Sequence, residues 1–172
     1  MKKTLFFKPL PLFLLGLFIS LISCAQNGAP ASPPAKASGK IGDANITIDY
    51  SSPSVKGRKI FGELEPYGKV WRAGANKATT FQTDKDIMVE GKALPAGKYA
   101  LFVIPTESDW TVVFNKTADQ WGAFKYDQSQ DALRVTVKPK KSDALTEKLA
   151  YDVNNNGIVL KWENVELPVA IK

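Results

Sequence analysis

The feature that most constrains the fold is a period of two in hydrophobicity, which begins at Ile41 and recurs to the end of the chain. In Ile46–Tyr50 apolar and polar residues alternate, as on a strand that buries one face. About nine such short segments follow one another with turn residues between them. Helical periodicity is poor outside single turns near Thr117–Trp121 and Ser142–Glu147. The pattern predicts an all-β fold, an antiparallel β-sandwich or jelly roll with little helix, and leaves an open barrel as the alternative.

Two turn signals indicate parts of the topology. Pro95–Gly97 is expected to join two strands within Lys85–Ile104, and the run Asn154–Gly157 is a strong hairpin signal. In Tyr99–Ile104 both sets of alternate residues are apolar. A strand of this kind belongs in the centre of a sheet that is covered on both faces.

Residues 1–23 have the pattern of a lipoprotein signal peptide, because two lysines precede the apolar run Leu10–Ile22. This run is shorter than the roughly 20 residues that a membrane span needs. Leu21–Cys24 resembles the lipobox of bacterial lipoproteins, in which the cysteine is acylated and becomes the new N-terminus. We therefore expect lipidation at Cys24 and a membrane anchor of two or three acyl chains, since a single chain binds only marginally. A plain secretory signal with an unmodified cysteine is the alternative.

Residues 24–40 are expected to be the acylated cysteine and a flexible linker, because Ala25–Lys40 is rich in Pro, Ala, Ser and Gly and has no hydrophobic periodicity. Residues 41–172 would then form a single β-sandwich domain. No aspartate follows Cys24 closely. By resemblance to lipoprotein sorting in Gram-negative bacteria, this favours the outer membrane, with the domain facing the periplasm.

The composition excludes several kinds of chemistry. The chain has no histidine and one cysteine, which rules out Ser-His-Asp and Cys-His catalysis, an internal disulfide and nearly all zinc, copper and haem sites. No motif points to a cofactor or to a metal. The 23 Lys and Arg exceed the 17 Asp and Glu only modestly, and three of the lysines lie in the expected signal peptide. No basic run is long enough to predict nucleic-acid binding.

The stretch Tyr50–Phe81 concentrates arginines, aromatic residues and turn residues. Arg72 poses a physical question there, because a guanidinium removed from water without a partner costs several kcal/mol. One interpretation is a buried ion pair that joins two strands, with Glu63, Glu65, Asp127 or Glu163 as the carboxylate. The other is a cleft in which arginines hold an anionic group and aromatic rings stack on a sugar. On this second interpretation the ligand-binding residues would be Arg58, Tyr67, Trp71, Arg72, Asn76 and Trp121.

Several long motifs in the chain resemble one family. The stretches SPSVKGRKIFGELEPYGKVWRAGAN, LPAGKYALFVIP, DWTVVFNK and DALRVTVKP are similar to the family catalogued as domain of unknown function 2911, over about Tyr50 to the C-terminus. The resemblance implies an exported protein, often a lipoprotein, of the kind typical of Bacteroidota, and it implies no particular activity. Two departures stand out: Lys77 occupies a position where members often carry glutamate, and Leu101–Val103 lacks a histidine that some members have.

These observations predict an envelope-anchored lipoprotein whose domain is a non-catalytic binding or accessory module. Its partner would be a small polar or anionic molecule such as a glycan, and the sequence carries no signal for an oligomeric state. One alternative is a structural or protein-interaction lipoprotein of the cell envelope. A third interpretation, a hydrolase, would need two carboxylates some 5–9 Å apart across a cleft.

Overall fold

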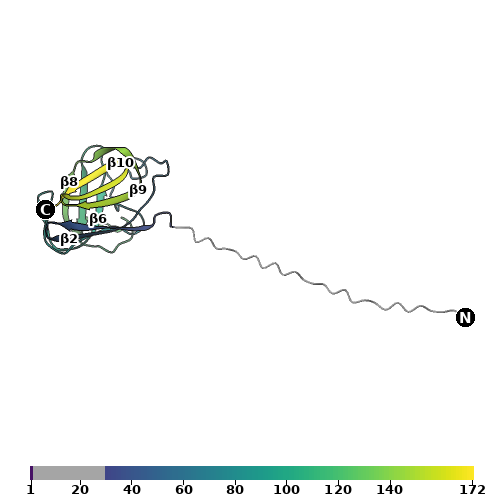
Figure 1. The fold of residues 1–172 in the computed structure, drawn as a ribbon, viewed down its shortest axis with the longest axis horizontal. Helices are drawn as coiled ribbons and strands as arrows, with labels where there is room; N and C mark the ends of the chain where they lie inside the picture. Colours follow the sequence, from purple (N-terminus) through teal and green to yellow (C-terminus); the bar gives the residue numbers. More distant parts are fainter. Residues whose placement is uncertain (2–29) are drawn as a thin grey trace.

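The computed structural model describes Met1 and residues 30–172, and Figure 1 shows the fold of that part of the chain. The expected signal peptide and Cys24 lie outside the described residues, apart from Met1. Ten strands and one short 3-10 helix, η1 (Gln128–Gln130), make up the regular structure of residues 30–172. The strands are β1 Pro34–Ile41, β2 Ala44–Ser51, β3 Thr79–Thr83, β4 Ile87–Val89, β5 Lys92–Leu94, β6 Gly97–Ile104, β7 Trp110–Asn115, β8 Asp131–Val137, β9 Lys140–Asn154 and β10 Gly157–Ala170. Over residues 30–172, none of the helical structure is long and apolar enough to span a bilayer.

The strands form antiparallel sheets, which confirms the predicted all-β sandwich. The largest sheet has six strands in the order β1-β2-β3-β6-β7-β8, so it is open, with β1 and β8 as its edges. β9 and β10 form a second sheet, and β4 pairs with β5 in a short third one. The hairpin predicted at Asn154–Gly157 is confirmed, because Asn154 pairs with Gly157 across the β9–β10 turn. Pro95 and Ala96 join β5 to β6, as the turn signal predicted, but Lys85–Ile104 contains three strands instead of the two expected, because Glu90 and Gly91 form a further turn between β4 and β5.

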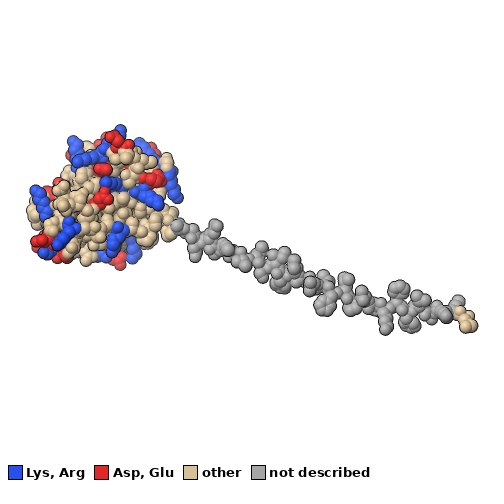
Figure 2. Space-filling view, viewed as in Figure 1, with Lys and Arg blue, Asp and Glu red and all other residues tan. Residues whose placement is uncertain are grey.

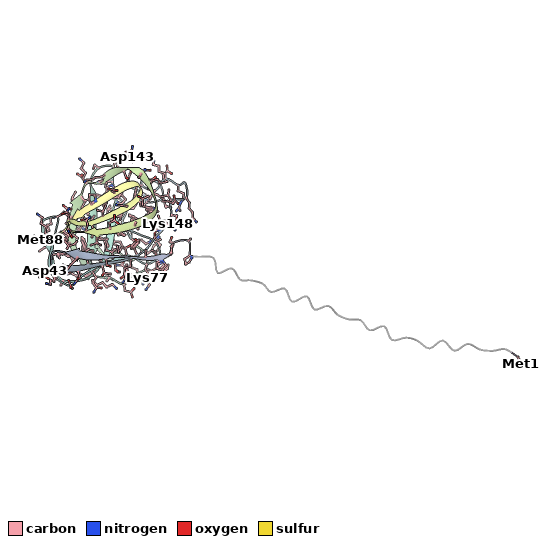
Figure 3. All side chains as sticks on the ribbon, viewed as in Figure 1. Met1, Asp43, Lys77, Met88, Asp143 and Lys148 are labelled. Atoms are coloured by element: carbon pink, nitrogen blue, oxygen red, sulfur yellow. The ribbon has the colours of Figure 1, made fainter. Side chains whose placement is uncertain are left out.

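The β9–β10 ribbon arches over one face of the six-stranded sheet (Figure 1). Figure 3 labels two residues of β9: Asp143 lies at the top of the domain, and Lys148 lies at the side of the domain. The ribbon bends where the pairing register shifts on both sides of Glu163, a residue with a φ of 56°. Its two ends meet, since the Ile171 N–H donates to the Asn156 carbonyl at 3.1 Å. The bend therefore lets a two-stranded sheet cover a wide core.

The core lies mainly between the β9–β10 ribbon and the six-stranded sheet. Tyr99, Leu101 and Val103 of β6 belong to this cluster, together with a group of aromatic rings. On the opposite face of the sheet, Ala100 and Phe102 pack in a smaller cluster, with Ile104 against it. Loops cover this second cluster through Val70, Ala123 and Tyr126. β6 is thus buried on both faces, as its sequence predicted.

The predicted domain boundary was wrong at its N-terminal end. Residues 34–40, assigned to the linker, are part of β1, which pairs with β2 from Pro34↔Ser51 to Ile41↔Ala44. The inward positions of β1 are small because the sheet lies close to β9: a Cβ on Gly39 would come within 2.8 Å of the Val153 side chain. Close packing of small residues gives no hydrophobic signal in the sequence. The helical turn predicted near Ser142–Glu147 was also wrong, because these residues belong to β9.

Candidate functional site

The candidate site is built by the long connection between β2 and β3, residues 52–78. Its first part is fixed to β9, since the Val55 N–H donates to the Glu147 carbonyl at 2.8 Å. A tight turn follows, in which the Glu65 N–H donates to the Ile60 carbonyl at 2.9 Å. Trp71 then pairs with Val103 of β6 through two backbone hydrogen bonds of 2.8 and 2.9 Å. The two attachments, with the turn between them, place both arginines of the segment beside one pocket.

A small pocket of about 180 Å³ opens between these attachments. Its volume is less than half that of another pocket, which Tyr67 and Trp110 help to line. The N-terminal segment reaches it through Ser32, next to the start of β1. The side chains that matter for its chemistry are Arg58, Leu64, Glu65, Arg72 and Trp162.

Arg72 is half-buried in the lining of the pocket. Within residues 30–172, its Nε atom is buried and has no hydrogen-bond partner. None of the ion pairs formed by the described residues includes Arg72. The strand-joining ion pair that the sequence left open is therefore not formed among the described residues.

Glu65 supplies the carboxyl group of the pocket. Burial raises the pKa of Glu65 to about 7, although the positive charges of Arg72 and then Arg58 act in the opposite direction. Near neutral pH this group is therefore present in both protonation states. From the sequence, Glu65 is one of four candidate partners for Arg72, because nothing in its neighbourhood, Leu64-Glu65-Pro66, distinguishes a half-buried glutamate from one in a solvated loop.

Trp162 of β10 lines the pocket and was missed by the sequence analysis. Its side chain is 1% exposed, and its ring stacks on Trp71 with an interplanar angle of 19°. Its Nε1 atom has no hydrogen-bond partner among the described residues. Trp162 lies in the strand that follows the predicted hairpin, and only the tertiary structure places its ring at this pocket.

Arg58 and Arg72 are the two predicted residues that the structure brings together. The Arg58 side chain is fixed by its Nε and Nη2 atoms, which donate to the carbonyls of Val55 at 2.9 Å and Ser54 at 2.6 Å. Its orientation is therefore preset. A guanidinium held in this way loses little freedom when an anion binds.

The other predicted residues lie elsewhere. Trp71 is buried in the core and donates its Nε1–H to the Gly74 carbonyl at 3.1 Å, which removes it from any solvent-facing site. Tyr67 lines a different pocket, together with Trp110. Asn76, with a φ of 60°, lines a shallow pocket beside Lys77, which Figure 3 shows on the side of the domain away from Asp143.

Trp121 is 60% exposed in a loop that also exposes Phe124 at 84%. This loop approaches Arg72 from the side: a Cβ on Gly122 would lie 3.3 Å from Arg72 Nη1. The Gly122 N–H donates to the Asn76 carbonyl at 3.1 Å, which ties the loop to the central stretch. Arg72 therefore connects the pocket with a loop that carries two exposed aromatic rings.

The charges outside the pocket are mixed. Figure 2 shows basic and acidic side chains interspersed over the visible face of the domain. No group of three or more acidic, cysteine or histidine side chains within residues 30–172 is placed to hold a metal ion. The pocket is lined by two guanidinium groups and one carboxyl group, and two of its lining residues, Arg72 and Trp162, each have a buried N–H group without an acceptor among the described residues. Such a set can bind an oxyanion by charge-assisted hydrogen bonds.

Comparison with known families gives one match. The model of a family described as a protein of unknown function (DUF2911) matches residues 32–171, which is nearly the whole described domain. The match begins at Ser32, the residue by which the N-terminal segment reaches the pocket. Neither curated proteins nor solved structures gave a match to this chain.

Proposed function

The chain belongs to the DUF2911 family, and we propose that it is an envelope-anchored lipoprotein whose β-sandwich binds the anionic group of a small polar molecule or glycan. The observation that carries the proposal is the pocket at Arg72 and Trp162, where two buried N–H donors have no acceptor among the described residues. Burying a polar group without a hydrogen bond costs about 1–3 kcal/mol. A ligand oxygen that accepts these bonds would recover that free energy.

The pocket is large enough for only a small part of a drug-sized ligand. Ligand pockets for whole drug-sized molecules span roughly 300–1,000 Å³, and this one has about 180 Å³. It suits a small acid or the acidic group of a larger molecule. For a larger ligand such as an acidic glycan, Trp121 and Phe124 offer exposed rings beside Arg72 on which a sugar can stack.

The other interpretations receive less support at this site. Glu65 is the one carboxyl group in the lining formed by the described residues, so a hydrolase with two carboxylates has no second acid there. A protein-interaction role is favoured by one observation, the exposure of Trp121 and Phe124 on the same loop. That role predicts that replacing these two aromatic residues removes partner contacts while pocket variants keep them.

Calorimetric titration of the full-length chain tests the binding proposal. Acetate, glucuronate and an acidic oligosaccharide serve as probes, with neutral glucose as the reference ligand. We expect the acidic probes to bind and Arg72→Met to weaken their binding at least tenfold. Lys59→Met is the matched control, because it removes a neighbouring exposed charge that pairs with Glu63 outside the pocket. No binding of any acidic probe, or equal loss in both variants, would rule the proposal out.

A further inference from the structure

The pocket contains a glutamate where an anion-binding site would be expected to contain only positive charge. Glu65 lines the same cavity as Arg58 and Arg72, and its side chain takes part in none of the ion pairs or side-chain hydrogen bonds that involve described residues alone. Its backbone is held on both sides, by its own N–H to Ile60 and by the Gly62 N–H to its carbonyl at 3.0 Å. The turn therefore holds the backbone of Glu65 beside the pocket.

From this arrangement, and resting on the binding function proposed above, we propose that the pocket takes up the carboxylate group of its ligand together with one proton, which Glu65 holds. An ionised Glu65 would place two carboxylates side by side in a partly desolvated site, and like charges at such a distance repel. A protonated Glu65 instead donates its O–H to one oxygen of the ligand. O–H···O⁻ bonds of this type are short and strong.

The remaining donors suit a group with two oxygens. Arg72 Nε and Trp162 Nε1 are the two buried nitrogens that lack acceptors among the described residues. With the Glu65 hydroxyl they give three donors, close to the roughly four lone-pair sites of a carboxylate. Phosphate and sulfate carry more oxygens and more charge, and each oxygen that is desolvated without a donor costs free energy. We therefore assign the site to carboxylates.

The charged groups around Glu65 are mixed: its two neighbouring arginines oppose proton uptake, and burial of the carboxyl group favours it. Its own loop contributes Arg58, and Lys59, which pairs with Glu63 at the exposed surface. The segment across the pocket contributes Arg72. From β10, the Glu163 carboxylate faces the same turn and accepts the Ile60 N–H at 3.3 Å.

Burial raises the pKa of Glu65 to about 7, although Arg72 and Arg58 lie nearby and lower it. A protonated form is therefore already populated before the ligand arrives. Linkage then requires that ligand binding raises the proton affinity of Glu65 as much as protonation raises the ligand affinity.

The test is titration calorimetry of the full-length chain with sodium acetate and sodium glucuronate, repeated with sodium sulfate. Each titration is run from pH 5.5 to 8.5 in two buffers of different ionisation enthalpy, so that the difference in heat gives the protons taken up. For the wild type we expect uptake approaching one proton per bound carboxylate above pH 7. Its affinity should fall by up to about tenfold per pH unit there.

Glu65→Gln keeps an uncharged donor in place and should bind acetate with an affinity independent of pH and without proton uptake. Glu63→Gln is the matched control, because it removes an exposed carboxylate of the same loop, and it should behave as the wild type. An ¹⁵N-labelled sample gives a direct readout: the indole N–H signal of Trp162, assigned by its loss in Trp162→Phe, should shift on binding.

The outcomes separate this inference from the function on which it rests. Acetate binding without proton uptake, or pH dependence that survives in Glu65→Gln, overturns the proton coupling and leaves the binding function intact. If sulfate binds as tightly as acetate, the assignment of the site to carboxylates is overturned. If neither acid binds the wild type at any pH and the Trp162 signal stays fixed, solvent alone occupies the pocket, and the proposed function is overturned with the inference.

Discussion

The indole rings of Trp71 and Trp162 stack with their centroids 5.6 Å apart, and the two rings differ in one respect. Trp71 donates its N–H to the Gly74 carbonyl, whereas the N–H of Trp162 has no acceptor among the described residues. Trp71 belongs to the core, and Trp162 belongs to both the core and the pocket. The stack therefore makes the inner wall of the pocket rigid.

This difference gives a matched pair of variants. Trp162→Phe and Trp71→Phe each remove part of a buried ring, and each should lower the free energy of unfolding by about 1–3 kcal/mol. Trp71→Phe should cost about 1 kcal/mol more, because it also breaks a satisfied hydrogen bond. Only Trp162→Phe should weaken acetate binding, by roughly tenfold. Urea unfolding and calorimetry measure the two effects, and equal weakening of binding in both variants would contradict a donor role for Trp162.

Arg72 should contribute to binding and little to stability. Because the guanidinium is half-buried and forms no ion pair with a described residue, Arg72→Met should change the free energy of unfolding by less than about 1 kcal/mol or increase it. Arg58→Met should cost about 1 kcal/mol, since it loses bonds to two backbone carbonyls. Urea unfolding compares the two variants. A loss above about 3 kcal/mol in Arg72→Met would indicate a broken buried ion pair instead.

The pH dependence of stability should report Glu65 directly. Its pKa in the folded chain is raised to about 7, so the folded state holds a proton that the unfolded state has already released. The free energy of unfolding should therefore fall as pH rises from the ordinary glutamate pKa towards about 7, and this component should be absent in Glu65→Gln. Denaturant titrations at several pH values between 4 and 8 measure it. Glu63→Gln should retain the wild-type slope of the free energy of unfolding against pH. The same slope in Glu65→Gln would show that the pKa of the Glu65 carboxyl group is not raised in the folded chain.

Closure of the β9–β10 ribbon depends on Gly157. A Cβ at this position would come within 2.0 Å of the Val169 carbonyl oxygen, and the φ of 141° is unfavourable for other residues. Gly157→Ala should lower the free energy of unfolding by more than about 3 kcal/mol. Gly42→Ala is the control, because its φ of 56° brings only the left-handed strain of about 1–2 kcal/mol and its Cβ would meet nothing within 4 Å. Thermal unfolding of the two variants should rank them in that order.

The sequence predicted those parts of the fold that local patterns determine. Asn154–Gly157 was recognisable as a hairpin because asparagine and glycine tolerate the backbone of a tight turn. Burial of β6 on both faces followed from its uninterrupted apolar residues. β1 was missed because its inward residues are small and give no alternating hydrophobic pattern. They are small because β1 packs closely against β9, and the sequence does not show how close the two sheets lie.

The site was predictable only in part. Arg58 and Arg72 lie fourteen positions apart in one turn-rich stretch, and their meeting could be expected from that clustering. Trp162 comes from β10, and no local pattern relates it to either arginine. Glu65 acquires its raised pKa from burial, which depends on how the whole connection between β2 and β3 folds against the sandwich. Trp71 was misplaced because the position of a ring, in a core or at a rim, is decided by tertiary packing.

β1 has a consequence for how neighbouring molecules of this protein behave when crowded together. An unprotected sheet margin is a template on which a second chain can add its own strand. β1 begins with proline and exposes Lys40 as well as Lys36, which pairs with Asp49 at 3.1 Å, so a like molecule approaching this margin would meet charged side chains and a missing amide proton. The strand that completes the sandwich thus also discourages strand-to-strand growth of aggregates.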